Sequence, residues 1–203
     1  PLKGKAPLLV SALMYTNPMM IYFGQELGEK GMDAEGFSGE DGRTTIFDYW
    51  TVDTIRRWRN NGKFDQKLLT EDELSLQEYY AKVLNICNSS EAVREGEFYD
   101  LMYVNPQLQK QYTFVRHSEK ETLLVIANFA SQDTEITINV PEHLFEYYGI
   151  KENTACEWTD LLSGSQITTA FSSNMPTKLN VPSWGGCILK MKSVKKAGKK
   201  TKS

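Results

Sequence analysis

The stretch Met20-Ile21-Tyr22-Phe23-Gly24-Gln25-Glu26 decides which fold the sequence predicts, because an apolar run ends there in a glycine and two polar residues. Residues 19–23 of the 203-residue chain are all apolar and lie between Pro18 and Gly24. A short, continuously apolar run of this kind is typical of a strand that is buried on both faces of a parallel sheet. The sequence therefore predicts a strand at 18–23.

A helix is predicted just before that strand. Pro7 suits a first helical turn, and the apolar residues of 8–15 recur on one helix face. The pair Asn17-Pro18 would end this helix, because the residue before a proline avoids the helical conformation. A helix followed by a short turn and a buried strand is the repeating unit of an α/β barrel.

Two more helices are predicted before residue 93. The first covers residues 52–60, and the second begins after Thr70 and ends near residues 88–89. Thr70 and Glu73 have the spacing of a capping box, in which each residue satisfies a backbone N–H of the other. The longer helix is the better marked of the two, because its start has this local signal.

The pattern changes to strands after residue 94. Isoleucines and a valine alternate with polar residues over 135–140, which is the period of a half-buried strand. Six further short runs, separated by polar turns, are predicted as strands: 112–116, 122–129, 156–161, 166–169, 178–181 and 186–191. Many short antiparallel strands at this spacing are typical of a β-sandwich.

The predicted fold class is therefore α+β. Residues 1–93 are predicted to be an incomplete (β/α)8-barrel remnant, built of helix, strand, loop and helices, and residues 94–194 an antiparallel β-sandwich. Residues 195–203 hold five lysines and no large apolar side chain, so we expect a disordered tail. Contact of this tail with an anionic partner is the alternative.

Composition excludes little but sets bounds. A net charge of −3 gives no argument for nucleic-acid binding, and no apolar run approaches the ~18 residues that span a bilayer. The three cysteines contain no CxxC pair, so neither a metal site nor a redox motif is predicted. We expect no cofactor, no metal, no nucleic acid and no membrane partner, while the cellular compartment stays open.

The motif at 21–26 resembles the eighth barrel strand of the α-amylase family, glycoside hydrolase family 13. Asp41-Gly42-Arg43 followed by Trp50 is similar to the acidic residue, arginine and tryptophan that follow that strand in the family. Phe114-Val115-Arg116-His117 and the run 124–129, which ends in Asn-Phe, resemble the opening hairpin of the family's C-terminal domain. The resemblance covers nearly the whole chain except the lysine tail.

This resemblance implies the end of an enzyme without its catalytic centre. Family members hydrolyse α-glucosidic bonds with retention, which requires two carboxyl groups about 5 Å apart. The family's Gly-x-Arg-x-Asp and Asn-His-Asp motifs are absent, and neither His117 nor His143 is followed by Asp. We therefore predict an α-amylase-type glycoside hydrolase for the longer protein, no catalytic residue in this chain, and no hydrolysis by the chain alone.

Four residues are predicted to bind substrate in the longer protein: Gln25, Glu26, Asp41 and Arg43. They follow the C-terminal end of a barrel strand, where the active sites of such barrels lie. Arg43 could donate to sugar hydroxyls from its fixed fork of N–H groups. In the alternative interpretation, Arg43 and Asp41 form a structural pair and Glu26 fixes the loop.

Three questions stay open from the sequence. The longer protein could be a non-catalytic, amylase-like subunit, since the discriminating residues lie upstream. The β-sandwich could itself bind carbohydrate. The strand at 18–23 lacks the neighbours that it has in a full barrel, so we expect it to be covered by local helices, to be poorly ordered, or to pair with another copy. The predicted ligand is an α-glucan or maltooligosaccharide.

Overall fold

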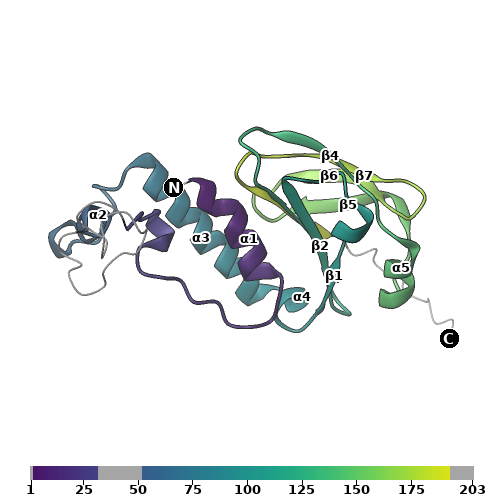
Figure 1. Cartoon of the computed structure of the whole chain (residues 1–203). Helices are drawn as coiled ribbons and strands as arrows, with labels where there is room; N and C mark the ends of the chain where they lie inside the picture. The colour runs from purple at the N-terminus through teal and green to yellow at the C-terminus, as the bar shows by residue number, and fades with distance from the viewer. Residues whose placement is uncertain (1, 32–51, 193–203) are drawn as a thin grey trace, which may run out of the picture.

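The computed structural model describes residues 2–31 and 52–192, and these form a helical layer packed on a β-sandwich (Figure 1). The helical part contains α1 (Lys5–Leu13), α2 (Asp53–Arg59), α3 (Glu71–Ser89) and α4 (Glu91–Arg94). Short 3-10 turns lie at η1 (Leu2–Gly4), η2 (Gln25–Leu27) and η5 (Asn60–Gly62). No helix within these described ranges is long and apolar enough to cross a membrane.

The sandwich is built from eight strands in two sheets. Six of them pair in the order β1-β2-β3-β8-β5-β6, and every pairing in this sheet is antiparallel. The bounds are β1 Glu97–Asp100, β2 Gln111–His117, β3 Thr122–Asn128, β4 Thr134–Ile138, β5 Asn153–Asp160, β6 Gln166–Phe171, β7 Thr177–Val181 and β8 Gly186–Met191. Strands β4 and β7 form the second sheet, while η6 (Met102–Val104) and α5 (Glu142–Tyr148) lie in the connections.

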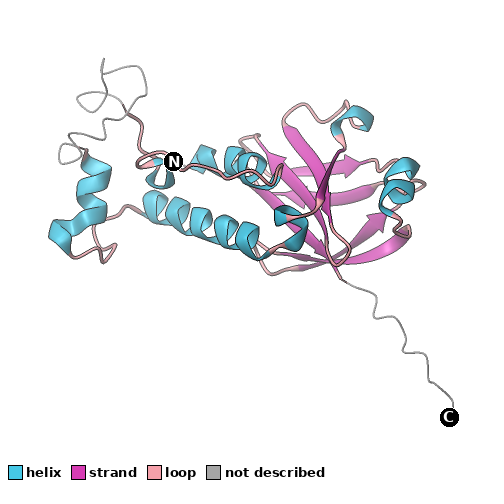
Figure 2. Cartoon of the chain, turned by 90° about the horizontal axis from the view of Figure 1, so that it is seen from below, coloured by secondary structure: helices cyan, strands magenta, loops and turns pink. Residues whose placement is uncertain are grey.

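The central strand β3 is buried along its whole length because both faces of the large sheet are covered. Leu124 and Ile126 face the core between the two sheets. Leu123 and Val125 face the other way and pack in a second core with α1 and α3. The continuously apolar run at 122–128 is thus explained by two covered faces, and Figure 2 shows the two longest helices, α1 and α3, along one side of the sheet.

Gly186 allows α1 to approach the sheet closely. A Cβ atom at this position would lie 2.0 Å from the carbonyl oxygen of Ile126 and 2.5 Å from Cδ1 of Leu9. Contacts that short cannot be accommodated without moving backbone, so glycine is required where β8, β3 and α1 meet. The same core is completed from α3 by Leu76, Tyr80 and Val83.

Arg116 joins the helical layer to the sandwich. Its side chain is 2% exposed, and its guanidinium donates to four backbone carbonyls. The acceptors are Met14, just after α1, at 3.0 Å, and Ala92, Val93 and Gly96 at 3.1, 2.9 and 2.7 Å. Burial lowers the pKa of this guanidinium from its ordinary value. A single side chain of the sheet therefore fixes the positions of two helix ends.

The predicted strand at 18–23 is not formed, and that prediction is wrong for this chain. These residues run as a loop beneath the helices and pair with no strand of the described part (Figure 1). Met19 and Ile21 pack against the helical core, whereas Met20 and Tyr22 are 85% and 51% exposed. An apolar run becomes a strand only where a neighbouring strand supplies hydrogen bonds, and here helices cover one side instead. This outcome agrees with the expected covering by local helices.

The other predicted elements are largely confirmed. The capping box at Thr70 and Glu73 is present, and the helix that it begins ends at Ser89. Three helices or strands were missed: the four-residue helix α4, the four-residue edge strand β1 and the helix α5. All three cysteines are free thiols. The lysine-rich tail at 195–203 lies outside the described residues.

Candidate functional site

The motif that follows residue 23 forms a tight turn against α3. Gly24 has a φ of +76°, and a Cβ atom there would lie 2.8 Å from Cβ of Glu29. The 3-10 turn η2 follows at once and inserts Leu27 into a small core with Val52 and Ile55. The glycine of the motif is therefore needed for both the backbone conformation and the close return of the chain.

Gln25 holds this turn in place. Its side-chain oxygen accepts from the backbone N–H of Tyr22 at 3.1 Å, and its amide nitrogen lies 3.0 Å from the hydroxyl of Tyr80 on α3. Burial raises the pKa of Tyr80, so this hydroxyl is neutral and able to take part in the bond. The amide of Gln25 is thus engaged in fixing the loop, although its side chain is exposed.

Glu26 follows Gln25 on the same turn. Within the described part of the chain, its carboxylate makes no hydrogen bond or ion pair, and its charge contributes to the raised pKa of Tyr80. Asp41 and Arg43 lie outside the described residues, so their predicted roles are not tested. The structure brings Gln25 and Glu26 together on one turn.

Two sets of polar contacts near this turn were not predicted from the sequence: hydrogen bonds to Glu29 and an ion pair between Arg57 and Glu73. Glu29 accepts from the backbone N–H of Gly31 at 2.9 Å and from the hydroxyl of Thr54 at the start of α2. The guanidinium of Arg57 on α2 donates to the carboxylate of Glu73 on α3, with Nε 3.0 Å from Oε2. These two contacts tie α2 to the turn and to the start of α3.

The charge state of Glu73 is set by opposing effects. Burial of its side chain, which is 5% exposed, favours the neutral acid. Hydrogen bonds from Arg57 and from the backbone of Thr70 outweigh burial and hold the pKa of Glu73 below its ordinary value. The sequence signalled the capping role of Glu73, but its second role depends on an arginine sixteen positions away.

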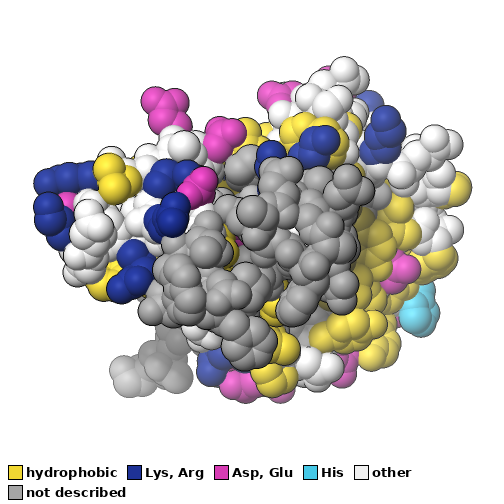
Figure 3. All heavy atoms as spheres, turned by 60° about the vertical axis from the view of Figure 1, so that its left-hand side comes forward, with side chains coloured by type: hydrophobic (Ala, Val, Ile, Leu, Met, Phe, Trp, Pro, Cys, Tyr) yellow, Lys and Arg dark blue, Asp and Glu magenta, His cyan; other side chains and the backbone are white. Residues whose placement is uncertain are grey.

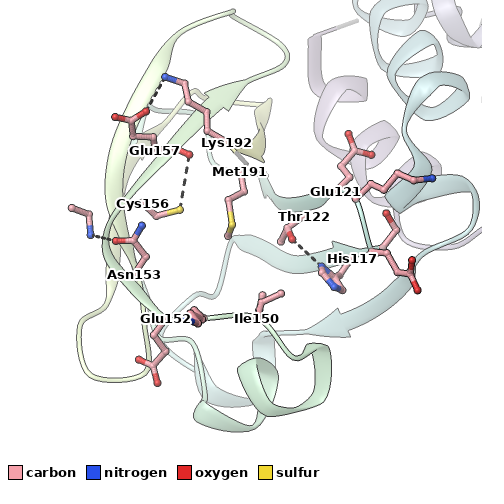
Figure 4. Close-up of a pocket in the computed structure, with 15 residues that line it drawn as sticks. His117, Glu121, Thr122, Ile150, Glu152, Asn153, Cys156, Glu157, Met191 and Lys192 are labelled. Atoms are coloured by element: carbon pink, nitrogen blue, oxygen red, sulfur yellow. Dashed lines mark hydrogen bonds and ion pairs between the residues drawn. The ribbon is translucent and has the colours of Figure 1, made fainter. Parts of the chain in front are cut away.

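A large pocket of about 840 Å³ opens on the sandwich, between the β2–β3 turn and the start of β5 (Figure 4). In this view His117 turns toward Thr122, and Glu157 pairs with Lys192 on the opposite side at 3.0 Å. Glu152 accepts from Ser172 and Ser173, while Glu121 accepts from Ser90 and pairs with Lys190. Each of these carboxylates is therefore engaged in a structural contact.

Three of the acids that line the pocket in Figure 4, Glu121, Glu152 and Glu157, are bound to serines or lysines of the same fold. No group of three histidine, cysteine or acidic side chains in residues 2–31 and 52–192 could hold a metal ion. The turn at 24–29 holds the polar side chains of Gln25 and Glu26 beside α3.

No protein-family model and no curated protein sequence matches this chain. Solved structures do match it. AmyP in complex with maltose superposes on 93% of this chain with a TM-score of 0.61 at 15% identity. The α-amylase of Geobacillus thermoleovorans with acarbose matches 96% of the chain with a TM-score of 0.57 at 13% identity, and the Anoxybacillus α-amylase matches 94% with 0.55 at 18%.

The chain has the fold of the C-terminal part of α-amylase-family structures. It spans 32–34% of the three matched chains, so about a third of their length. A trehalulose synthase, MutB, matches at a TM-score of 0.57 and 17% identity, and 38% of that chain is covered. At such low identities, the TM-scores of 0.55–0.61 show a shared fold. The shared fold confirms the resemblance carried by the motif at 21–26 and the hairpin at 114–129.

Proposed function

We propose that this chain is the C-terminal part of an α-amylase-type glycoside hydrolase that acts on α-glucans with retention. One observation carries the proposal: the chain matches α-amylase-family structures over more than nine-tenths of its length while spanning about a third of theirs. Two of those structures hold maltose and acarbose, and a second structure of AmyP holds maltotriose. The ligand class proposed for the longer protein is therefore an α-glucan or maltooligosaccharide.

Each segment of the chain is proposed to form a different part of the longer enzyme. Residues 1–93 supply the end of the catalytic barrel, residues 94–194 the sandwich, and 195–203 a tail. The turn that carries Gln25 and Glu26 forms part of the wall of the active site, with Asp41 and Arg43 in the loop beyond it. The nucleophile and the acid come from the upstream segment, since a retaining enzyme needs both close together.

The experiment extends the reading frame upstream of Pro1 and compares the longer protein with the 203-residue chain. We expect an upstream segment that holds two aspartates and a glutamate in the family's motifs, and release of reducing sugar from starch by the longer protein. The 203-residue chain alone should release none. An upstream segment without these carboxylates would contradict the hydrolase and favour a non-catalytic, amylase-like subunit.

A second comparison tests the predicted binding residues within the longer protein. Arg43→Lys keeps the charge but loses the planar fork, so KM for maltoheptaose should rise several-fold with little loss of kcat. Glu26→Gln removes a charge without changing shape, and should act in the same direction if Glu26 contacts sugar. Unchanged KM in both variants would contradict their assignment to the substrate-binding wall.

Two exposed apolar side chains of the 18–23 segment suggest a contact between copies of this chain. Met20 and Tyr22 are exposed here, and in the longer protein neighbouring barrel strands would cover them. In the isolated chain we propose that they mediate self-association. Light scattering over a range of concentrations should show a dimer that Met20→Glu abolishes; a monomer at every concentration would exclude this contact.

A further inference from the structure

An aromatic surface of the sandwich has no role in the function proposed so far. It forms a pocket of about 330 Å³ lined by Phe98, Tyr99, Asp100, Tyr103, His143 and Tyr147. These residues come from β1, from η6 and from α5, which the chain brings together although 44 positions separate Tyr99 from His143. We call it the tyrosine pocket. Figure 3 shows apolar side chains gathered beside a histidine on the sandwich side of the molecule.

The rings of the tyrosine pocket are exposed where packing alone would bury them. Tyr103 is 61% exposed and Tyr147 is 55% exposed. Tyr99 lies half-buried between them, with ring centroids 6.4 Å from Tyr103 and 6.2 Å from Tyr147. Two exposed tyrosine side chains therefore flank Tyr99.

Hydrogen bonds hold these rings in fixed positions. The hydroxyl of Tyr99 lies 2.9 Å from the hydroxyl of Tyr103 and 3.0 Å from Nδ1 of His143. The ring of His143 is nearly parallel to that of Tyr147, at an angle of 20°. Tyr148 packs behind Tyr99 and donates from its hydroxyl to the carbonyl of Glu97 at 3.3 Å. The surface is therefore organised before any ligand arrives, which lowers the entropic cost of binding.

The polar groups of the pocket suit a neutral, hydroxylated ligand. Asp100 lines the pocket, and its Oδ1 accepts from the backbone N–H of Met102 at 2.9 Å. No lysine or arginine lines the pocket, so an anionic ligand such as a phosphate would meet a negative charge without compensation. Tyrosine rings offer an apolar face with a polar tip, and a pyranose ring has the same two-sided character.

We propose that the tyrosine pocket binds an α-glucan chain through stacking on Tyr103 and Tyr147, with Asp100 and His143 as hydrogen-bond partners. This inference rests on the proposed function, which supplies the ligand class. The volume lies at the small end of the range of about 300–1,000 Å³ for ligand pockets, so it accommodates one or two glucose units of a longer chain. The site lies on the sandwich and contributes no group to the hydrolysis.

The test measures binding of maltoheptaose to the intact 203-residue chain by calorimetry and by NMR. We expect saturable binding that Tyr103→Ala and Tyr147→Ala each weaken by about three- to tenfold, because each removes a stacking face. Tyr103→Phe keeps the ring but loses the hydrogen bond to Tyr99, so it should bind more tightly than Tyr103→Ala and somewhat more weakly than the parent chain. The matched control is Phe129→Ala, an aromatic residue 37% exposed on the loop after β3, and it should leave binding unchanged.

Three results would overturn the proposal. The first is no binding of maltoheptaose at millimolar concentration by variants and parent that all show cooperative unfolding. The second is binding that both alanine variants leave intact, which places the sugar elsewhere. The third is a dimer without sugar binding that Tyr147→Ala dissociates, which assigns the pocket to a contact between copies. Hydrolysis by the longer protein is measured separately. A negative binding result therefore contradicts the tyrosine pocket and not the proposed function, whereas an upstream segment without carboxylates contradicts the proposed function and not the pocket.

Discussion

The guanidinium of Arg116 lies 3.0 Å from the carbonyl oxygen of Met14, across 102 positions of sequence. The same group reaches three further carbonyls between residues 92 and 96. A charge that is this deeply buried is stabilised by backbone dipoles instead of a carboxylate in the described structure. The contact determines how the helical layer sits on the sheet.

Replacing Arg116 by Met should destabilise the chain by about 3 kcal/mol or more, because several buried carbonyls lose their donors at once. Urea unfolding measures the loss, and hydrogen exchange should show faster opening at residues 92–96. Arg116→Lys keeps the charge but has no fork, so it should recover little of the stability. A variant Arg94→Met, at a side chain that is 50% exposed, serves as the control and should change stability little.

Gly186→Ala should be among the most damaging small substitutions in the chain. The added methyl group would meet the carbonyl oxygen of Ile126 at 2.0 Å and Cδ1 of Leu9 at 2.5 Å. Strand β8 must therefore shift relative to β3, and Leu9 must give way, at a cost of about 3 kcal/mol. The neighbouring Gly185→Ala provides the control, since its nearest contact would be an ordinary 3.5 Å. Thermal unfolding that shifts equally in both variants would contradict the close packing around Gly186.

Tyr80→Phe and Gln25→Ala should each cost about 1 kcal/mol, because both remove the same hydrogen bond. The double variant should be less destabilised than the sum of the two, by about 0.5–1 kcal/mol, and a double-mutant cycle measures that difference. Tyr79→Phe is the matched control. Its hydroxyl is buried and has no partner in the described structure, so its removal should be neutral or slightly stabilising. Simple additivity would show that Gln25 does not hold the turn through Tyr80.

Glu121 should make the fold sensitive to acid. Burial of its carboxylate favours the neutral form, but hydrogen bonds from Lys190, Ser90 and the backbone of Ala92 prevail, and the pKa lies below its ordinary value of 4.5. The charged form is therefore favoured by folding. Its stabilisation is complete above pH 4.5 and is lost as the pH falls through the lower folded pKa.

Urea unfolding at a series of pH values checks this dependence. Glu121→Gln should be less stable than the parent chain at pH 7 and should lose less stability between pH 4.5 and pH 3. Glu95→Gln, whose side chain is 66% exposed, is the control and should follow the parent curve. If the free energy of unfolding of Glu121→Gln falls with pH in parallel to that of the parent, other groups cause the acid sensitivity. Glu73, whose pKa is also lowered, is one such group.

Much of the fold could be predicted because its signals are local. The start of α3 follows from Thr70 and Glu73, which satisfy each other's backbone within one turn. The strands of the sandwich follow from alternation, and β3 from an apolar run that suits a strand covered on both faces. α5 was missed although its ends carry a usable signal, a proline at 141 and a left-handed glycine at 149.

The remaining features depend on partners that lie far away in sequence. Residues 18–23 have the composition of a strand, but strand formation depends on neighbours that composition does not reveal. The motif at 24–26 pointed to the right turn, yet the partner of Gln25 is a tyrosine 55 positions away. The four carbonyls around Arg116 and the rings around Tyr99 likewise come together only in the folded chain. Of the four predicted binding residues, two lie on the described turn and two lie outside the described residues.

The double covering of β3 bears on how this protein can be dissected in the laboratory. A shortened chain of residues 94–203 would keep the described strands β1 to β8 but expose Leu123, Val125 and Ile188 to water. We expect such a truncation to precipitate or to need a detergent, whereas a chain that begins at α1 should remain in solution. The apparent border at residue 93 separates helix from strand in sequence, but a cut made there passes through a shared core.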